Sequence, residues 1–216
     1  MQGTVVYPWA MDAGEAAGLQ AAKGHDADAI DVARFQSGNT DAFESLLTRH
    51  ERATFQVCSR MLGNKEDALD AVQETFLRVY RALNSFRGEA AFKTWLVGIA
   101  LNVCRNKLSS SSERNRRVTA SITQEDPENG EVSDVELKDH TPDPEAATLG
   151  HELRSALERA LSNLAPEHRE ILVLREIQDM DYEELAAVLS CPIGTVKSRL
   201  CRARQALREA MVGLWP

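Results

Sequence analysis

Residues 181–211 have the sequence DYEELAAVLSCPIGTVKSRLCRARQALREAM, which predicts two helices joined by a tight turn. Asp181 is the expected N-cap of the first helix, and Glu184 completes a capping box. Residues 191–194, Cys-Pro-Ile-Gly, predict the turn. Proline ends one helix and fits the first turn of the next, while glycine tolerates an unusual backbone. The pattern is typical of a helix-turn-helix.

The second of these helices combines an apolar stripe with basic residues on its other faces. The stripe has spacings of four, three and four, at Val196, Leu200, Ala203 and Leu207. The basic residues are Lys197, Arg199, Arg202, Arg204 and Arg208. A helix docked on one side and cationic on the other suits the DNA major groove. The charges alone also fit an amphipathic hairpin with a solvated basic face. The capped first helix, the turn and the basic second helix together favour DNA binding.

Length and composition indicate a water-soluble chain with enough hydrophobic residues to form buried cores. The 216 residues suit one large or two small domains, with 43% hydrophobic and 27% charged residues. There is no run of 18 apolar residues, and the first residues lack both a basic segment and a continuous apolar core. The sequence therefore predicts neither a transmembrane helix nor a signal peptide, and a cytoplasmic location follows.

The formal net charge of −8 argues at first against a nucleic-acid partner, but the acids are unevenly placed. Residues 118–150 contain nine acidic residues and one lysine, and residues 1–33 contain five acidic residues and one lysine. The remaining chain is much less acidic than the total suggests. Acidic segments joined to basic helices indicate a protein whose own affinity for DNA is low.

The cysteines and the known catalytic motifs point away from a metal site and from an enzyme. None of the four cysteines lies in a C-x-x-C pair, and no nearby histidines complete a zinc pattern. Cys58, Cys104 and Cys191 are expected to be small buried hydrophobes, whereas Cys201 is expected on an exposed flank. No Walker loop, G-x-G-x-x-G, H-E-x-x-H or nucleophile elbow is present. We therefore expect no catalytic residues, no metal and no cofactor.

Helical periodicity without any strand pattern predicts an all-α protein of two small helical domains. The first domain is predicted to end at a serine run, Ser109–Ser112. Helices are expected at 41–62, 65–83, 91–108 and 151–163, with another opening at Ala165-Pro166 before the helix-turn-helix. The pair Gly63-Asn64 is expected to separate the first two, and the apolar, core-facing side of the second is expected to carry Leu69, Val72, Phe76, Val79 and Leu83. Trp95 is assigned mostly to the core. The predicted organisation is a mobile tail at 1–28, a helical domain at 29–112, an acidic linker at 113–149 and a second helical domain at 150–216.

Four segments together resemble the extracytoplasmic-function group of bacterial sigma factors, the two-domain members of the sigma-70 family. They are GNTDAFESLLTRH at 38–50, DALDAVQETFLRVYRAL at 67–83, FRGEAAFKTWLVGIALNVCRNKL at 86–108 and DYEELAAVLSCPIGTVKSRLCRAR at 181–204. The resemblance covers residues 30–112 and 150–212, and its DNA-reading segments are similar to those of the envelope-stress type. A regulator with an unrelated helical sensor domain would explain residues 150–212 but not the pattern at 67–108.

The resemblance implies that the first domain binds the clamp of core RNA polymerase and opens the minus-10 element. Melting requires a pocket for an extruded base, which aromatic faces and amide groups suit. Phe86 would supply an aromatic wall and Asn102 would read base edges, although Phe86 alone also fits a core residue that closes its loop. The expected minus-10 residues are Phe86, Arg87, Lys93, Asn102, Arg105 and Lys107. The expected polymerase-binding residues are Asp67, Asp70, Gln73, Glu74 and Arg78.

The second domain would read the minus-35 element as duplex DNA. The expected residues are Thr195, Lys197, Ser198, Arg199, Cys201 and Arg202, with Arg199 and Arg204 touching phosphates. Cys201 departs from the family pattern, because close relatives can carry a bulky side chain there. The resemblance also implies an anti-sigma factor as a further partner, besides core polymerase and promoter DNA.

Overall fold

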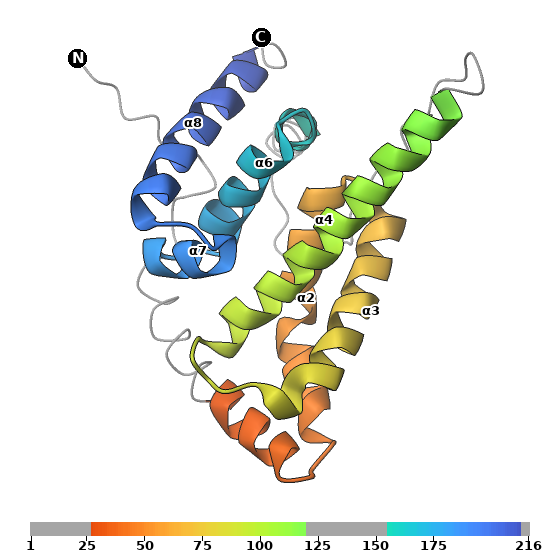
Figure 1. The fold of residues 1–216 in the computed structure, drawn as a ribbon, viewed down its shortest axis with the longest axis vertical. Coiled ribbons are helices and arrows are strands. Elements are labelled where there is room, and N and C mark those ends of the chain that lie inside the picture. The colour runs from red at the N-terminus through yellow and green to blue at the C-terminus, as the bar shows by residue number, and fades with distance from the viewer. Residues whose placement is uncertain (1–26, 120–154, 213–216) are drawn as a thin grey trace, which may run out of the picture.

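The computed structural model describes residues 27–119 and 155–212, and within these ranges helices joined by turns and loops are the only regular elements (Figure 1). A short N-terminal helix spans residues 27–36. It precedes α2 (Ala42–Leu62), α3 (Lys65–Ala82), the short 3-10 helix η1 (Leu83–Ser85) and α4 (Phe92–Thr119). The second described range contains a helix at 155–162, α6 (Pro166–Leu172), the π-helix η2 (Val173–Ile177), α7 (Tyr182–Leu189) and α8 (Ile193–Val212). The predicted all-α fold is confirmed.

The core of the first domain lies where α2, α3 and α4 pack against one another (Figure 1). Its largest fully buried side chains include Leu46, Met61, Leu83, Leu96 and Leu101. Leu69 was expected in this core, but 46% of its surface is exposed. The neighbouring Ala68 and Ala71 are buried instead, because a small side chain lets α3 approach α2 and α4 closely at this turn.

The break between α2 and α3 follows the predicted Gly63-Asn64 pair. Gly63 has φ +76° and its amide donates to the carbonyl of Ser59 at 2.9 Å, which closes the end of α2. The Asn64 side chain then accepts a hydrogen bond of 2.7 Å from the amide of Asp67 and caps α3. Each residue satisfies backbone groups that the helix end leaves unpaired.

Two boundaries differ from those predicted. Helix α4 runs through the serine run to Thr119, because serine weakens a helix only slightly and neither proline nor glycine occurs between Ser109 and Thr119. Asp28, assigned to the tail, lies in the N-terminal helix and is buried against α2. Its carboxylate is 2.9 Å from Nε2 of His50 and forms an ion pair with Arg49. Most of the predicted tail and of the acidic linker lies outside the described residues.

In the second domain the helix-turn-helix forms as expected, with one correction in its turn. Asp181 Oδ1 accepts from the amides of Glu183 and Glu184 at 2.8 Å, and the Asp181 amide donates to Glu184 Oε2 at 3.0 Å, so the capping box is confirmed. The unusual backbone falls at Ser190, with φ +50°, and not at Gly194, which lies inside α8. The αL residue that ends α7 therefore comes before the proline, and Gly194 needs no special conformation.

The two domains are packed on each other, with α2 against α6 and η2, and α4 against α7. Arg169 on α6 is buried, and no acidic side chain pairs with it among the residues that the structure describes. Its guanidinium donates to the carbonyls of Leu161 at 2.9 Å and Met61 at 2.7 Å, and also to those of Ser162 and Leu164. One buried cation thus caps the helix at 155–162 and reaches the end of α2. Among the helices described, none is long and apolar enough to cross a membrane.

Candidate nucleic-acid interface

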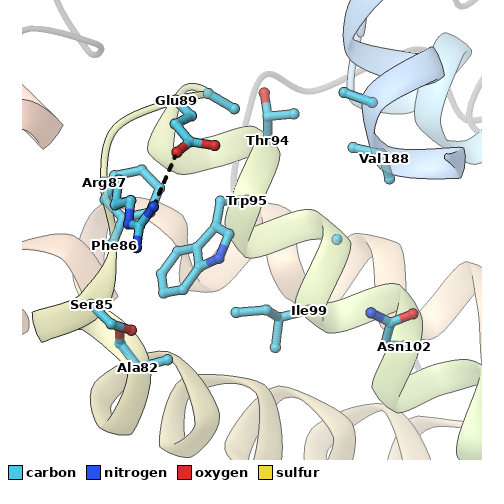
Figure 2. Close-up of a pocket in the computed structure, with 13 residues that line it drawn as sticks. Ala82, Ser85, Phe86, Arg87, Glu89, Thr94, Trp95, Ile99, Asn102 and Val188 are labelled. Carbon is cyan, nitrogen blue, oxygen red and sulfur yellow. Dashed lines mark hydrogen bonds and ion pairs between the residues drawn. The ribbon is translucent and has the colours of Figure 1, made fainter.

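A pocket of about 660 Å³ lies between the loop that precedes α4, α4 itself and α7 (Figure 2). Its lining includes Phe86 and Arg87 from the loop, and Trp95 and Asn102 from α4. Ala187 and Val188 of α7 complete it. The structure therefore brings three of the six residues predicted for the minus-10 element, Phe86, Arg87 and Asn102, to one cavity.

The wall of this pocket is aromatic. The rings of Phe86 and Trp95 are 4.7 Å apart with a tilt of 38°, and Phe86 also meets Phe92 edge-on at 6.1 Å. Phe86 therefore closes its loop onto the core and also faces the cavity, so both interpretations of this residue apply. Trp95 had been assigned mostly to the core, yet it is half-buried and lies among the labelled side chains of the cavity in Figure 2.

The polar residues predicted on α4 have partners within the chain. The exposed Asn102 accepts a hydrogen bond of 3.0 Å from Arg105 through Oδ1. Arg105 also forms an ion pair with Glu170 of α6, and Lys93 donates to the carbonyl of Gln178 at 2.7 Å. Arg87 is exposed and only 3.9 Å from Glu89. Two of the four cations among the predicted minus-10 residues, Lys93 and Arg105, thus contact the second domain.

Lys107, the last predicted minus-10 residue, lies on a different side of α4. Its ammonium is 3.8 Å from Asp67 and 3.6 Å from Asp70, both predicted to bind polymerase. The structure therefore brings Lys107 together with the acidic face of α3 and not with the pocket. The reason is register: Lys107 lies five residues beyond Asn102, which is more than one helical turn and places it on another face.

The exposed face of α3 combines the predicted polar residues with apolar ones. Asp67, Asp70 and Gln73 are exposed, and Glu74 pairs with Arg78 one turn later. Leu69, Leu77 and Tyr80 are 46%, 56% and 44% exposed. These three share a helix side with Gln73, because they are spaced four, four and three residues apart. None of the three was predicted as a surface residue of this site, because Leu69 was expected in the core and no role was predicted for Leu77 or Tyr80.

The recognition helix, α8, presents the predicted residues to solvent. Val196, Leu200, Ala203 and Leu207 are buried, as expected, while Lys197, Ser198, Cys201 and Arg202 are exposed. Thr195 and Arg199 are half-buried. Arg204 had been expected to touch phosphates, but its guanidinium is bound to Glu176 at 2.7 and 3.0 Å within the domain.

The ring of Tyr182, the first residue of α7, lies next to two cations at the edge of this surface. The ammonium of Lys197 is 5.6 Å from the ring centroid, and the guanidinium of Arg175 is 5.4 Å from it. These distances suit cation–π attraction. Arg175 is fixed further by a hydrogen bond of 2.5 Å to the carbonyl of Met180. Neither Tyr182 nor Arg175 had been predicted as a site residue, because the ring and the cations are far apart in sequence.

Glu170 is the most buried acid near these surfaces, with 5% exposure. Burial raises the pKa of Glu170, and the nearby guanidinium of Arg105 opposes that rise through its charge and hydrogen bond. Arg199 of the recognition helix contributes a smaller effect in the same direction as Arg105. One carboxylate thus lies within the electrostatic reach of cations from both predicted DNA surfaces.

Comparison with protein families matches both domains. Residues 46–114 match sigma-70 region 2, and residues 154–207 match sigma-70 region 4. The RNA polymerase sigma-H factor of Pseudomonas aeruginosa is 39% identical over 181 residues, which cover 83% of this chain and 91% of the relative. The chain is a member of the extracytoplasmic-function sigma factors of the sigma-70 family. It is therefore a transcription initiation factor that binds core RNA polymerase and directs it to promoters.

Other relatives agree with this membership. The extracytoplasmic-function sigma-E factor of Escherichia coli K12 is 39% identical over 180 residues, which cover 83% of this chain and 92% of the relative. CnrH, solved with the cytosolic domain of CnrY, has a TM-score of 0.60 at 28% identity, covering 87% of this chain and 99% of that chain. RpoE, solved with the anti-sigma factor NepR from Bartonella quintana, has a TM-score of 0.58 at 26% identity, covering 78% and 96%. Sigma factors of this family are non-catalytic initiation factors.

Proposed function

We propose that the two domains of this sigma factor divide promoter recognition between them. Residues 29–112 bind core polymerase and open the minus-10 element, and residues 150–216 read the minus-35 element. Residues 113–149 join them as an acidic connection. The family matches to region 2 and region 4 support this division.

The aromatic pocket carries the minus-10 part of the proposal. A melted base offers a π-face and a hydrogen-bonding edge, and it needs a surface for each. Phe86 and Trp95 supply the stacking wall, and the exposed amide of Asn102 lines the same cavity. Arg87, Lys93 and Arg105 would hold the flanking phosphates.

Permanganate footprinting of unpaired thymines in the open complex tests this assignment. Asn102→Ala and Phe86→Ala should weaken the footprint while leaving the affinity for core polymerase unchanged. Asn106→Ala is the matched control, because Asn106 is an exposed asparagine on α4 that does not line the pocket. Footprints of normal strength in both pocket variants would show that Phe86 and Asn102 have only a structural role.

The recognition helix carries the minus-35 part. Lys197, Ser198 and Arg202 lie off the buried stripe and are exposed, as base-reading residues in the major groove must be. Thr195, Arg199 and Cys201 lie on the flanks of the same surface. The exposed thiol of Cys201 gives this helix a small side chain at a position that can be bulky in relatives.

The exposed face of α3 is the proposed contact with the polymerase clamp. Asp67, Asp70, Gln73, Glu74 and Arg78 supply its polar groups, and Leu69, Leu77 and Tyr80 add apolar surface. An apolar centre with a charged rim is the usual anatomy of a specific protein interface. We further propose that the chain acts in the cytoplasm with polymerase and catalyses no reaction of its own.

An anti-sigma factor is the proposed controlling partner, in a stress response. Two similar solved structures are complexes, one of CnrH with the cytosolic domain of CnrY and one of the sigma factor RpoE with the anti-sigma factor NepR. Competition between a purified anti-sigma domain and core polymerase for this chain tests the idea. Mutually exclusive binding supports it, and simultaneous binding of both contradicts it.

A further inference from the structure

Gln36, the last residue of the N-terminal helix, contacts the start of the loop that carries Phe86. Its side-chain amide nitrogen donates to the carbonyl of Leu83 at 3.0 Å and to the carbonyl of Phe86 at 2.9 Å. A primary amide has two N–H donors, so one side chain can supply both hydrogen bonds. The acceptors are 47 and 50 residues away along the chain. Gln36 therefore joins the end of η1 and the beginning of the loop to a distant helix.

The loop between η1 and α4 has few other hydrogen bonds that fix its backbone. The Phe86 amide donates to the carbonyl of Leu83 at 3.2 Å, which closes η1. The backbone of residues 87–90 makes no hydrogen bond to another backbone group in the described ranges. In the same ranges the Phe86 carbonyl accepts from Gln36 alone. The position of the Phe86 backbone therefore depends on this glutamine.

The end of the N-terminal helix from which Gln36 extends is itself held firmly. The preceding residue, Phe35, is only 5% exposed, and its ring centroid lies 5.3 Å from that of Tyr80 on α3 and 5.9 Å from that of Phe43 on α2. The start of the helix is attached to α2 through the buried carboxylate of Asp28. Because both ends of this short helix are packed on α2 or α3, the Gln36 amide is presented at a defined place.

Gln36 does not line the aromatic pocket, whereas the loop residues Ser85, Phe86 and Arg87 do (Figure 2). The ring centroid of Phe86 is 4.7 Å from that of Trp95, so movement of the loop backbone would change the shape of the pocket wall. Side chains of a recognition site have to be held within about 0.5 Å of their working position by the residues around them. For Phe86, the hydrogen bonds of Gln36 supply such support.

We propose that Gln36 is a positioning residue for promoter opening. It acts through Phe86, whose backbone it holds so that the ring forms one wall of the base pocket. The inference rests on the proposed function for the melted base that this pocket accepts. The N-terminal helix is then part of the apparatus that opens the promoter, although none of its residues lines the pocket.

The first experiment uses the free full chain without DNA and follows the Phe86 amide by NMR hydrogen exchange. Gln36→Met keeps the length of the side chain and removes its donors, so exchange should become about fivefold faster, as for the loss of a single hydrogen bond. Gln36→Lys supplies a donor again and should return the exchange rate toward that of the wild type. An unchanged rate in Gln36→Met overturns the proposal, as does an increase that Gln36→Lys does not reverse.

The second experiment is permanganate footprinting of the open complex, at a concentration of core polymerase that saturates each variant. Gln36→Met should weaken the footprint about threefold, because a displaced aromatic wall holds the melted base less well. Gln205→Met is the matched control, since it makes the same change at an exposed glutamine whose amide donates to Glu209 at 2.7 Å within α8. Equal footprints of the two variants overturn the proposal. A loss explained entirely by weaker binding to core polymerase overturns it as well.

The proposed function and the role of Gln36 fail in different experiments. Exchange of the Phe86 amide in the free chain does not depend on what the pocket binds. A normal footprint with Phe86→Ala refutes the minus-10 assignment and leaves the exchange result intact. A footprint that weakens with Phe86→Ala but not with Gln36→Met refutes the role of Gln36 alone.

Discussion

Thr94 and Glu184 join the two domains through a carboxylate that serves both. Thr94 Oγ1 donates to Oε1 of Glu184 at 2.9 Å, while Oε2 of the same carboxylate accepts from the amide of Asp181 at 3.0 Å and completes the capping box of α7. The start of the helix-turn-helix is thus fixed by a residue that also contacts α4. Separation of the domains leaves the cap intact and frees the threonine.

Loss of this cap should destabilise the second domain. Glu184→Ala removes one partner of the capping box and should lower the free energy of unfolding by about 1 kcal/mol. Glu183→Ala is the control, because Glu183 lies in the same turn and contributes only its amide to the cap. Thermal or urea unfolding compares the two, and equal losses would show that the Glu184 side chain is not a stabilising cap.

Base reading by the recognition helix should depend on Arg202. Arg202→Ala should reduce discrimination against altered minus-35 sequences by about 1–3 kcal/mol, because a lost base contact relaxes preference. Arg208→Ala removes an exposed arginine further along α8 and should leave preference unchanged. Holoenzyme binding to promoters with single substitutions measures the difference. Undiminished discrimination in Arg202→Ala would contradict the assignment.

The ring of Tyr182 should hold Lys197 in place for DNA. Tyr182→Ala should weaken promoter binding by about 0.5–1 kcal/mol, the range of an exposed cation–π contact. Tyr182→Phe keeps the ring and should retain most of the affinity. Equal affinities for the alanine and phenylalanine variants would show that the ring contributes nothing to Lys197.

The charged rim of α3 should contribute to polymerase affinity. Glu74→Lys reverses a charge on the proposed clamp surface and breaks the pair with Arg78, so it should weaken core binding by about tenfold. Glu44→Lys makes the same change on an exposed position of α2 and serves as the control. Fluorescence anisotropy with core polymerase reports both affinities. Equal affinities of Glu74→Lys and Glu44→Lys for core polymerase would show that Glu74 does not belong to the clamp contact.

The attachment of the N-terminal helix should depend on pH. Burial raises the pKa of Asp28, but hydrogen bonds and charges of His50 and Arg49 outweigh it, so the pKa lies below its ordinary value near 3.8. The stabilisation is therefore fully present above the ordinary pKa and is lost as the pH falls through the lowered one. Asp28→Asn should destabilise the chain at neutral pH by about 1–3 kcal/mol and flatten its acid-dependent loss of stability. An unchanged acid profile in this variant would refute the role.

Local chemistry explains why most helices and their caps could be predicted. Gly63, Asn64 and the capping box of Asp181 each act within one turn, so their partners are adjacent in sequence. The end of α4 was missed because serine is a weak signal, and no strong breaker follows it closely. Leu69 was misplaced because periodicity alone does not say which of two adjacent faces is covered.

The candidate sites were predictable where one helix carries them and not where two domains meet. The exposed residues of α8 follow from its buried stripe, and Phe86 with Asn102 follows from the family pattern. The engagement of Lys93 and Arg105 by the second domain depends on partners 85 and 65 residues away along the chain. Lys107 was predicted among the minus-10 residues. Its contacts with Asp67 and Asp70 result from the packing of α3 on α4, which the sequence of α4 alone does not indicate.

Many acceptors between the two domains are backbone carbonyls, at Met61, Ala53 and Gln178. A carbonyl is present whatever the side chain, so substitution at these three acceptor positions leaves the hydrogen-bonding group in place. Only the donors Arg169, Gln178 and Lys93 can be lost by a point change in the gene. A search for covarying positions would therefore overlook these three contacts, and a genetic screen for variants that lose them should recover substitutions of the donor residues.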